Sequence, residues 1–338
     1  MTTTEGDRVD VSVVVCTRNR AERLLTALAP ILVSLDDARH AGIAAELLLV
    51  DNASTDQTPA IIKALEEQEA RVRSVLAAVP GIGRARNRGL EASRGGIIIF
   101  TDDDIVVPPQ WVATLARPIL NGDADATVGG VQMASDLRRP WMTPGLTARY
   151  YADVPQPPAR NPGMIGANMA IRRSVRERLR FDDELGTQRY PGSEDVLFYV
   201  QTLEAGFRVS GVEGAVVEHH FDPARLTIDR LESLADGYGR CDAFFYYHWL
   251  HAHLPLQRVR IWIHQAEHAL RLGIARGNRF DEEVIRLRRE VAFHTELQSL
   301  SGTPRRYAKR GLDLVGSVAG GDSSSPVGSP APGTGGVG

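Results

Sequence analysis

Four short apolar runs lie in the first third of the chain, and longer segments with a helical pattern separate them. The runs cover residues 11–16, 46–50, 72–76 and 97–100. The segments between them with a helical pattern are 21–35, 59–68 and 84–93. Buried strands of this length that alternate with helices predict βαβ units and a parallel sheet covered on both faces. The sequence therefore predicts an α/β fold, a Rossmann-like three-layer sandwich.

The second half of the chain has a mixed pattern followed by a helical one. Residues 126–133, 164–171 and 207–219 are predicted strands, and residues 194–205 are a predicted helix that Gly206 ends. We expect one domain over residues 11–225, with halves at 11–105 and 106–225, and a C-terminal helical extension over residues 226–302. A flexible N-terminus at 1–10 and a disordered Gly, Ser and Pro rich tail at 303–338 complete the predicted organisation.

The amino-acid composition limits the classes of protein to which this chain can belong. Apolar residues make up 43% and charged residues 24%, which is typical of a globular chain. A formal net charge of -3 gives no indication of a nucleic-acid partner. Cys16 and Cys241 are too few for a disulfide framework or a cysteine zinc site. With no apolar signal segment and no run long enough to span a bilayer, we expect a cytoplasmic protein.

Polar residues follow three of the predicted strands at the point where each strand ends. Thr17, Arg18 and Asn19 follow the first strand, Asp51 follows the second, and an acidic triplet follows the fourth. The carboxyl ends of parallel strands lie at one edge of a sheet, where ligands bind in folds of this class. We therefore expect these side chains to line one crevice.

The acidic triplet Asp102, Asp103 and Asp104 carries the clearest chemical indication. Three adjacent carboxylates after a buried strand repel one another unless a cation neutralises them, and carboxylate oxygens are preferred ligands of Mg²⁺ and Mn²⁺. Such an ion can bridge a pyrophosphate and stabilise a leaving nucleoside diphosphate. The structural alternative is an acidic loop or a helix cap before Pro108.

Two further segments suit a nucleotide but also have plain structural explanations. Asp51 can accept a hydrogen bond from a nucleobase or simply cap the following turn. Gly83 stands in a glycine-containing turn that opens a helix carrying Arg84, Arg86 and Asn87, which suits an anion. The turn is not a complete G-x-G-x-x-G motif, because position 86 is arginine, so an ordinary basic turn is the alternative.

Glu194 and Asp195 begin the predicted helix 194–205, and His219 and His220 end the last predicted strand. A carboxylate at a loop-to-helix junction can serve as a general base for a hydroxyl, although acids in a first helical turn also interact favourably with the helix dipole. A neutral imidazole at a strand end can complete a metal site or be an ordinary core histidine.

The order of these segments resembles that of the family 2 glycosyltransferases over roughly residues 11–222. SVVVCTRNR resembles their first strand and nucleotide loop, VDNASTDQT their second strand, and GIGRARNRGLEASRGGIIIFTDDD their helix and metal-binding strand. GANMAIRR, FDDELG and SEDVLFYVQTLEAGF resemble their acceptor half. The resemblance implies the GT-A fold, with the nucleotide-sugar-binding half at 11–105 and the acceptor half at 106–225.

Residue roles follow from the resemblance position by position. It implies that Asp51 contacts the base, that Asp102 and Asp104 are the two acids of the D-x-D motif, and that Asp195, with Glu194 beside it, is the catalytic base of an inverting enzyme. The implied metal ligands are Asp102, Asp104, His219 and His220. The expected contacts with the nucleoside-diphosphate sugar are Thr17, Arg18, Asn19, Asp51, Gly83, Arg84, Arg86, Asn87, Asp102 and Asp103.

The implied reaction is transfer of a sugar from a nucleoside-diphosphate donor to an acceptor hydroxyl, with Mn²⁺ or Mg²⁺ as cofactor. The acceptor is a saccharide, a lipid-linked molecule or a small molecule. The alternatives for the C-terminal helices are packing on the core, a homodimer interface and contact with the inner membrane face. The alternatives are a retaining glycosyltransferase, a sugar nucleotidyltransferase and a non-catalytic relative. His264, Glu267 and His268 also match H-x-x-E-H, the motif of one class of metalloprotease.

Overall fold

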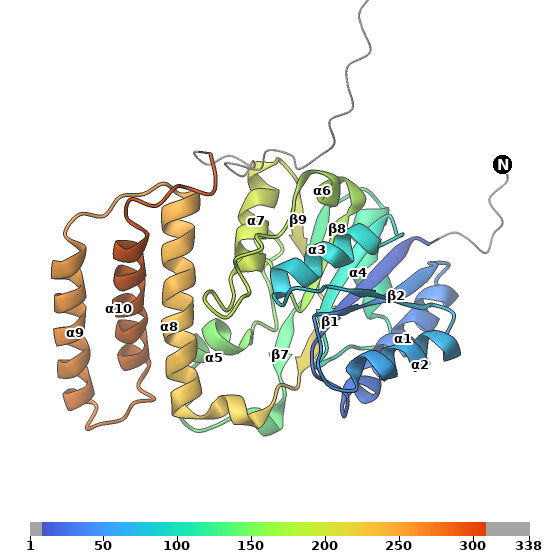
Figure 1. Cartoon of the computed structure of the whole chain (residues 1–338). Helices are drawn as coiled ribbons and strands as arrows, with labels where there is room; N and C mark the ends of the chain where they lie inside the picture. The colour runs from blue at the N-terminus through green and yellow to red at the C-terminus, as the bar shows by residue number, and fades with distance from the viewer. Residues whose placement is uncertain (1–8, 309–338) are drawn as a thin grey trace, which may run out of the picture.

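The structure is a computed structural model that describes residues 9–308 (Figure 1). The strands are β1 (Val11–Thr17), β2 (Ala45–Asp51), β3 (Val72–Leu76), β4 (Ile97–Asp102), β5 (Ile105–Val106), β6 (Ala126–Val128), β7 (Val131–Met133), β8 (Asn168–Arg172), β9 (Val209–Gly211) and β10 (Val217–His219). The helices are α1 (Leu24–His40), α2 (Thr58–Gln68), α3 (Ile82–Ala92), α4 (Trp111–Leu120), α5 (Pro144–Tyr151), α6 (Arg173–Arg178), α7 (Glu194–Glu204), α8 (Ile228–Phe244), α9 (Gln257–Ile274) and α10 (Glu282–Leu300). A π-helical segment, η4 (Phe245–Trp249), continues α8.

A large mixed sheet forms the centre of the fold, with strand order β3-β2-β1-β4-β8-β6-β9. Strands β3, β2, β1 and β4 are parallel, as the sequence predicts, whereas β8 runs antiparallel to both of its neighbours. A small second sheet has the order β5-β10-β7. The predicted α/β class is confirmed, and the antiparallel strand β8 marks the end of the parallel part of the sheet.

Alternate side chains of β1 enter two different apolar layers. Val13 and Val15 pack with α1 and α4 on one face, while Val14 packs with α3 and α7 on the other. A strand has this alternation because successive side chains point to opposite faces. A nearly all-apolar and fully buried strand such as β1 is therefore stable only between two layers of helices, which is the predicted three-layer arrangement.

Two predicted strands are interrupted in the structure. The segment 126–133 divides at Gly129 and Gly130 into β6 of the large sheet and β7 of the small one. A Cβ at Gly130 would lie 2.1 Å from the carbonyl oxygen of Pro155, so only glycine allows the two segments to approach this closely. The segment 207–219 likewise divides into β9 and β10, which belong to different sheets.

The C-terminal helices lie side by side at one edge of the α/β body, with α10 between α8 and α9 (Figure 1). No residue of α9 is buried, and its exposed apolar residues are Val259, Trp262, Ile263, Leu270 and Ile274. This face is where a homodimer or membrane contact is predicted, and both contacts stay predictions. Among residues 9–308, no helix combines the length and the apolar composition needed to cross a bilayer.

The chain returns to the α/β body after α10. The first residues of the predicted disordered tail therefore make specific contacts, which differs from the prediction. Tyr307 is buried, and its hydroxyl donates a 2.5 Å hydrogen bond to Asp182 Oδ2. Arg306 Nε lies 3.3 Å from the same carboxylate oxygen. Residues 303–308 are therefore anchored by specific polar contacts that their Gly, Ser and Pro rich surroundings do not reveal. The other residues of the predicted tail, 309–338, and most of the predicted flexible N-terminus, 1–8, lie outside the described residues.

Candidate active site

The ends of β1, β2 and β4 meet at one edge of the sheet. In the parallel register Thr17 is paired with Asp51, and Cys16 with Asp102. A pocket of about 370 Å³ opens at this edge, and its walls include the acidic triplet, the start of α7 and the end of β10. Of the strand-end residues that the sequence singles out, Thr17, Arg18 and the acidic triplet line this pocket, whereas Asn19 and Asp51 do not.

The middle acid of the triplet is bonded to the protein itself. Asp103 Oδ2 accepts a 2.6 Å hydrogen bond from the Thr17 hydroxyl, and its Oδ1 accepts a 3.0 Å bond from Arg20 Nε. Only 8% of the Asp103 side chain is exposed. Both carboxylate oxygens therefore tie the loop after β4 to the loop after β1, and this geometry favours a structural role.

The last acid of the triplet lies beside an imidazole. Asp104 Oδ1 is 3.3 Å from His219 Nε2, and the other ring nitrogen, Nδ1, is 3.2 Å from the Tyr151 carbonyl oxygen. Because a carbonyl only accepts, Nδ1 carries a proton. In the protonated ring Nε2 donates to Asp104, a contact that helps to lower the pKa of that acid, and in the neutral ring Nε2 presents a lone pair. Arg225 Nη1 lies 4.0 Å from Asp104 Oδ2. Two adjacent acceptor atoms at a pocket wall are well suited to share a cation.

A buried arginine joins the first acid to helix α7. Arg86 Nη2 lies 3.2 Å from Asp102 Oδ1, and Nη1 donates to Glu194 Oε1. The Arg86 side chain is 4% exposed, and a Cβ at Gly166 would lie 2.2 Å from its Nη2. The sequence analysis places Arg86 among the contacts of the sugar donor. In the structure its guanidinium is held between two carboxylates and covered by Gly166.

The two acids at the start of α7 have different surroundings. Glu194 is buried, and burial raises its pKa to about 7 even though Arg86 opposes the shift. Its Oε2 has no hydrogen-bond partner among the described residues. Asp195 is only half-buried, and its Oδ2 accepts a 2.9 Å bond from the Gly166 backbone N–H at the pocket wall. Of the two acids, Asp195 is the one accessible to a bound molecule.

The predicted nucleotide loops contact each other across the ends of β1 and β2. Asp51 Oδ1 accepts a 2.9 Å bond from the Ser54 backbone N–H, so the capping interaction that the sequence offers as one explanation does form. Asn19 Oδ1 accepts a 2.8 Å bond from the backbone N–H of Thr55. Arg18 is exposed and lines the pocket. Asp51 and Asn19 therefore order the loops, and Arg18 is the residue of this set with a free approach to an anion.

Gly83, Arg84 and Asn87 of the glycine-containing turn do not line the pocket. A Cβ at Gly83 would be 2.3 Å from the Asp182 carbonyl oxygen, so this glycine allows a close helix-to-loop contact. Arg84 lies 3.6 Å from Glu184. The side-chain amide of Asn87 both donates to and accepts from the backbone of Phe181, each at 2.9 Å. The structure thus uses Gly83, Arg84 and Asn87 to pack the segment after α6, not to form a phosphate cradle.

His220 also lies apart from the site. Its Nε2 is 2.9 Å from Glu218 Oε2, and the side chain is 43% exposed. His219 and His220 separate because consecutive side chains at the end of a strand point in opposite directions. The predicted pair of histidines therefore contributes a single imidazole, that of His219, to the pocket.

Several pocket residues are absent from the sequence prediction. Arg20, Arg225 and Tyr238 all line the pocket, and Arg20 lies 3.7 Å from Asp104. Arg20 stands in the same polar run as Thr17 and could have been included on that ground. Arg225 and Tyr238 belong to the segment after β10, whose pattern gives no indication of a site.

The geometry of Asp103 leads to a prediction on stability. Burial raises its pKa from 3.8 to about 6, against the opposing effects of Arg20 and Thr17. Its ionised form therefore destabilises the fold by about 3 kcal/mol at neutral pH. We expect Asp103→Asn to stabilise the chain by about 1–3 kcal/mol at pH 7.5 in EDTA, the lower values reflecting the loss of the Arg20 contact.

Because the ionised form of Asp103 is the destabilising one, the stability gained by Asp103→Asn depends on pH. The penalty is complete above pH 6, shrinks as the pH falls, and disappears below the unfolded pKa of 3.8. Urea unfolding of both proteins at pH 7.5 and pH 4.5 measures it. A variant that is less stable than the wild-type chain at pH 7.5, or a stability gain equal at both pH values, would contradict the prediction.

The H-x-x-E-H motif does not form the cluster that a metalloprotease needs. His264 Nδ1 lies 3.0 Å from Glu267 Oε2 within α9. The compact group of possible metal ligands that includes His264 contains Glu290 and His294 of α10 and omits His268. No observation on the described residues therefore supports the metalloprotease alternative.

Known proteins resemble this chain in sequence and in fold. The protein-family model described as glycosyl transferase family 2 matches residues 12–180. The succinoglycan biosynthesis protein ExoO of Rhizobium meliloti is 28% identical over 229 residues, which cover 62% of this chain and 60% of that protein. Glucosyl-3-phosphoglycerate synthase of Mycobacterium tuberculosis is 32% identical over 135 residues, 38% of this chain and 36% of that protein. The chain thus spans less than two-thirds of either relative.

A mannosyltransferase from Pyrobaculum calidifontis, PcManGT, solved in complex with GDP-Man and Mn²⁺, has a similar structure. Its TM-score is 0.58 at 20% sequence identity, and the match covers 86% of this chain and 87% of that one. The shared architecture is the GT-A fold, as the sequence predicts. Together with the family match over half of the chain, it leads to one conclusion: the chain belongs to glycosyl transferase family 2.

Proposed function

We propose that this protein transfers a sugar from a nucleoside-diphosphate donor to an acceptor hydroxyl, with a divalent cation as cofactor. The observation that carries the proposal is the single pocket in which Asp104 and His219 lie on one wall and Asp195 lies at the start of α7. Membership of glycosyl transferase family 2 supports the reaction class. The complex of PcManGT with GDP-Man and Mn²⁺ supports the type of donor and cofactor.

Asp104 and His219 are the proposed cation ligands, with Asp102 next to them. Asp104 Oδ1 and His219 Nε2 are 3.3 Å apart, close enough to bind one ion after a small adjustment. Mg²⁺ is commonly held by one or two carboxylates, with substrate phosphates completing its coordination. A pocket with few protein ligands therefore fits a cation that arrives with a diphosphate. A bound divalent cation neutralises the negative charge that develops on the leaving diphosphate.

The basic side chains of the pocket are the proposed anion contacts. Arg18 is exposed, and Arg20 and Arg225 lie beside the acidic triplet. Guanidinium groups form paired hydrogen bonds with phosphate oxygens, so these three residues suit a diphosphate. Asp51 keeps its proposed contact with the nucleobase through Oδ2, because only Oδ1 is used by the Ser54 N–H.

Asp195 is the proposed general base, and Glu194 is a positioning residue that acts through Arg86. Asp195 takes the proton of the acceptor hydroxyl while the hydroxyl oxygen forms a bond to the anomeric carbon. The bond from that carbon to the diphosphate oxygen breaks in the same step, and the electron pair leaves with the nucleoside diphosphate. A single in-line displacement inverts the anomeric configuration, which NMR of the product measures directly.

A thermal-shift panel of UDP, GDP and dTDP, each with and without Mn²⁺, tests this proposal. We expect one diphosphate to raise the melting temperature only when Mn²⁺ is present. Asp104→Asn should abolish that metal-dependent shift, because it removes the charged ligand while preserving the size of the side chain.

His219 and His220 provide a matched pair of variants for the same experiment. His219→Gln should lose most of the metal-dependent shift, whereas His220→Gln, whose side chain contacts Glu218 outside the pocket, should retain it. Equal shifts in the two variants would remove His219 from the ligand set. No metal-dependent shift with any of the diphosphates would refute the donor class.

A further inference from the structure

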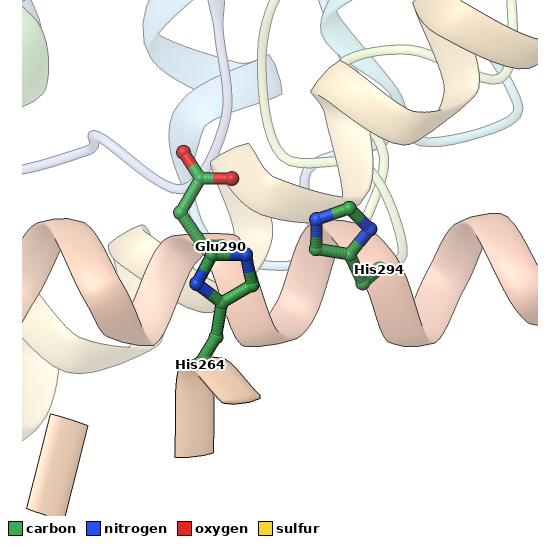
Figure 2. A group of neighbouring side chains, drawn as sticks. All are labelled: His264, Glu290 and His294. Atoms are coloured by element: carbon green, nitrogen blue, oxygen red, sulfur yellow. The ribbon is translucent and has the colours of Figure 1, made fainter. Parts of the chain in front are cut away.

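A second group of possible metal ligands lies between α9 and α10, outside the active-site pocket. His264 of α9 and Glu290 and His294 of α10 each offer one ligand atom, and these atoms all lie within 4.8 Å of one another. Figure 2 shows both imidazole rings and the carboxylate directed toward a common space. The two rings are nearly parallel, with an interplanar angle of 7°.

Neighbouring side chains determine which ring nitrogens are free. Gln257 donates through Nε2 to the Leu254 carbonyl oxygen, so its Oε1 faces His294 Nδ1 and accepts the hydrogen at 2.8 Å. His264 Nδ1 is likewise 3.0 Å from a carboxylate oxygen of Glu267. In the neutral form of each ring, Nδ1 therefore carries the proton and Nε2 keeps a lone pair. A carboxylate or carbonyl behind the ring is the usual support of a metal-binding histidine.

The charge and burial of the group also suit a cation. The His294 side chain is buried, while His264 and Glu290 are 21% and 30% exposed, which leaves a path for an ion. The Glu290 carboxylate adds one negative charge to the two imidazoles of the group. Arg286 Nη1, 3.8 Å from Glu290 Oε1, is the positive group that an ion would have to compete with.

We propose that His264, Glu290 and His294 form a second metal site, for Zn²⁺ or a related transition-metal ion, that links α9 to α10. Three ligands on a tetrahedral Zn²⁺ ion stand roughly 3.4 Å apart at bond lengths of about 2.1 Å. Ligand atoms up to 4.8 Å apart therefore need to approach one another by up to about 1.4 Å. A water molecule would complete the coordination.

The position of this site between α9 and α10 indicates a structural role. No residue of α9 is buried, so this helix has little apolar contact to hold it against α10. A metal bridge from His264 to the two α10 residues would attach α9 at its middle. The ligand set also separates this site from the catalytic one, because imidazole-rich sites favour zinc and carboxylate-rich sites favour Mg²⁺ and Mn²⁺.

Metal titration of the full chain, without a histidine tag, tests the proposal. Asp104→Asn is the background, because it weakens the cation site of the catalytic pocket. Binding of Zn²⁺ is followed by calorimetry and binding of Co²⁺ by its visible spectrum. We expect one ion per chain, with excess Mg²⁺ unable to displace it. Hydrogen exchange across residues 257–274 should slow when Zn²⁺ is added.

The matched variants are His264→Asn and His268→Asn, which remove histidines one turn apart on α9. We expect His264→Asn to weaken Zn²⁺ binding more than about 100-fold, beyond the 10–100-fold typical of losing a supporting residue, and His268→Asn to have no such effect. Glu290→Gln is a second test that spares the buried His294. Absence of Zn²⁺ binding in the Asp104→Asn background would overturn the site, as would equal affinity in the two histidine variants. Both results leave the proposed glycosyl transfer unaffected.

Discussion

Replacing Asp195 with asparagine is expected to lower kcat by about 10²–10⁴-fold, the contribution typical of a general base. The asparagine side chain has nearly the same shape, and its carbonyl oxygen can still accept the hydrogen bond from the Gly166 backbone N–H. The asparagine side chain cannot take a proton from the acceptor hydroxyl. The affinity for the nucleoside diphosphate and Mn²⁺ should therefore be nearly unchanged, and the loss should appear in kcat.

Steady-state kinetics with the donor identified by the thermal-shift panel measure this effect. Asp183→Asn is the matched control, because Asp183 is a 52% exposed acid that pairs with Arg306 outside the pocket. Its kcat should stay within about twofold of the wild-type value. If Asp195→Asn turned over at a near-normal rate, Asp195 would not be the base, and a retaining mechanism would become the better explanation.

Replacing Arg86 with methionine is expected to destabilise the fold by about 3–5 kcal/mol, the usual cost of breaking a buried ion pair. The guanidinium bridges Asp102 and Glu194, and without it Glu194 becomes a buried acid with no compensating charge. This loss of stability should be largest at pH 8. It should shrink at pH 5.5, where protonation removes the charge of Glu194, whose pKa is already raised to about 7.

A double-mutant cycle distinguishes this ion pair from simple loss of packing. Arg86→Met combined with Glu194→Gln removes both charges, so the double variant should be at least about 1 kcal/mol more stable than the sum of the single effects predicts. Urea unfolding of the four proteins gives the coupling free energy. Strict additivity would mean that Arg86 contributes only its volume. Arg86→Lys should restore little, because an ammonium group lacks the planar fork that bridges two carboxylates.

The strand pattern of the first hundred residues could be predicted from the sequence because burial on both faces leaves a strong apolar signal. The structure confirms strands at the four predicted positions, and polar residues follow β1, β2 and β4 at one edge of the sheet. The position of the acidic triplet could be predicted for the same reason, whereas Asp195, in the first turn of α7, was assigned to the site by the family resemblance alone. Parallel strands bring their carboxyl ends together whatever the loops between them contain.

The direction of each polar side chain could not be predicted in this way. Arg86 points toward Glu194, more than a hundred positions away, and Asn87 toward Phe181, because tertiary contacts decide where a polar group finds its partner. The assignment of Arg86 and Asn87 to a phosphate cradle used only their closeness to a helix start. Similarly, the breaks at Gly129 and Gly130 depend on contacts with Pro155 and Asn168, which no local pattern contains.

The contacts of Arg306 and Tyr307 with Asp182 attach the end of the helical extension to the α/β body. Helix α8 packs on the α/β body through Leu231, Ala235 and Phe244, and the polypeptide contacts that body again after α10, so the chain is attached both before α9 and after α10. Asp182 in turn belongs to the segment that packs on Gly83 at the start of α3. Exchange of these helices between relatives therefore has to preserve the returning junction as well as the departing one.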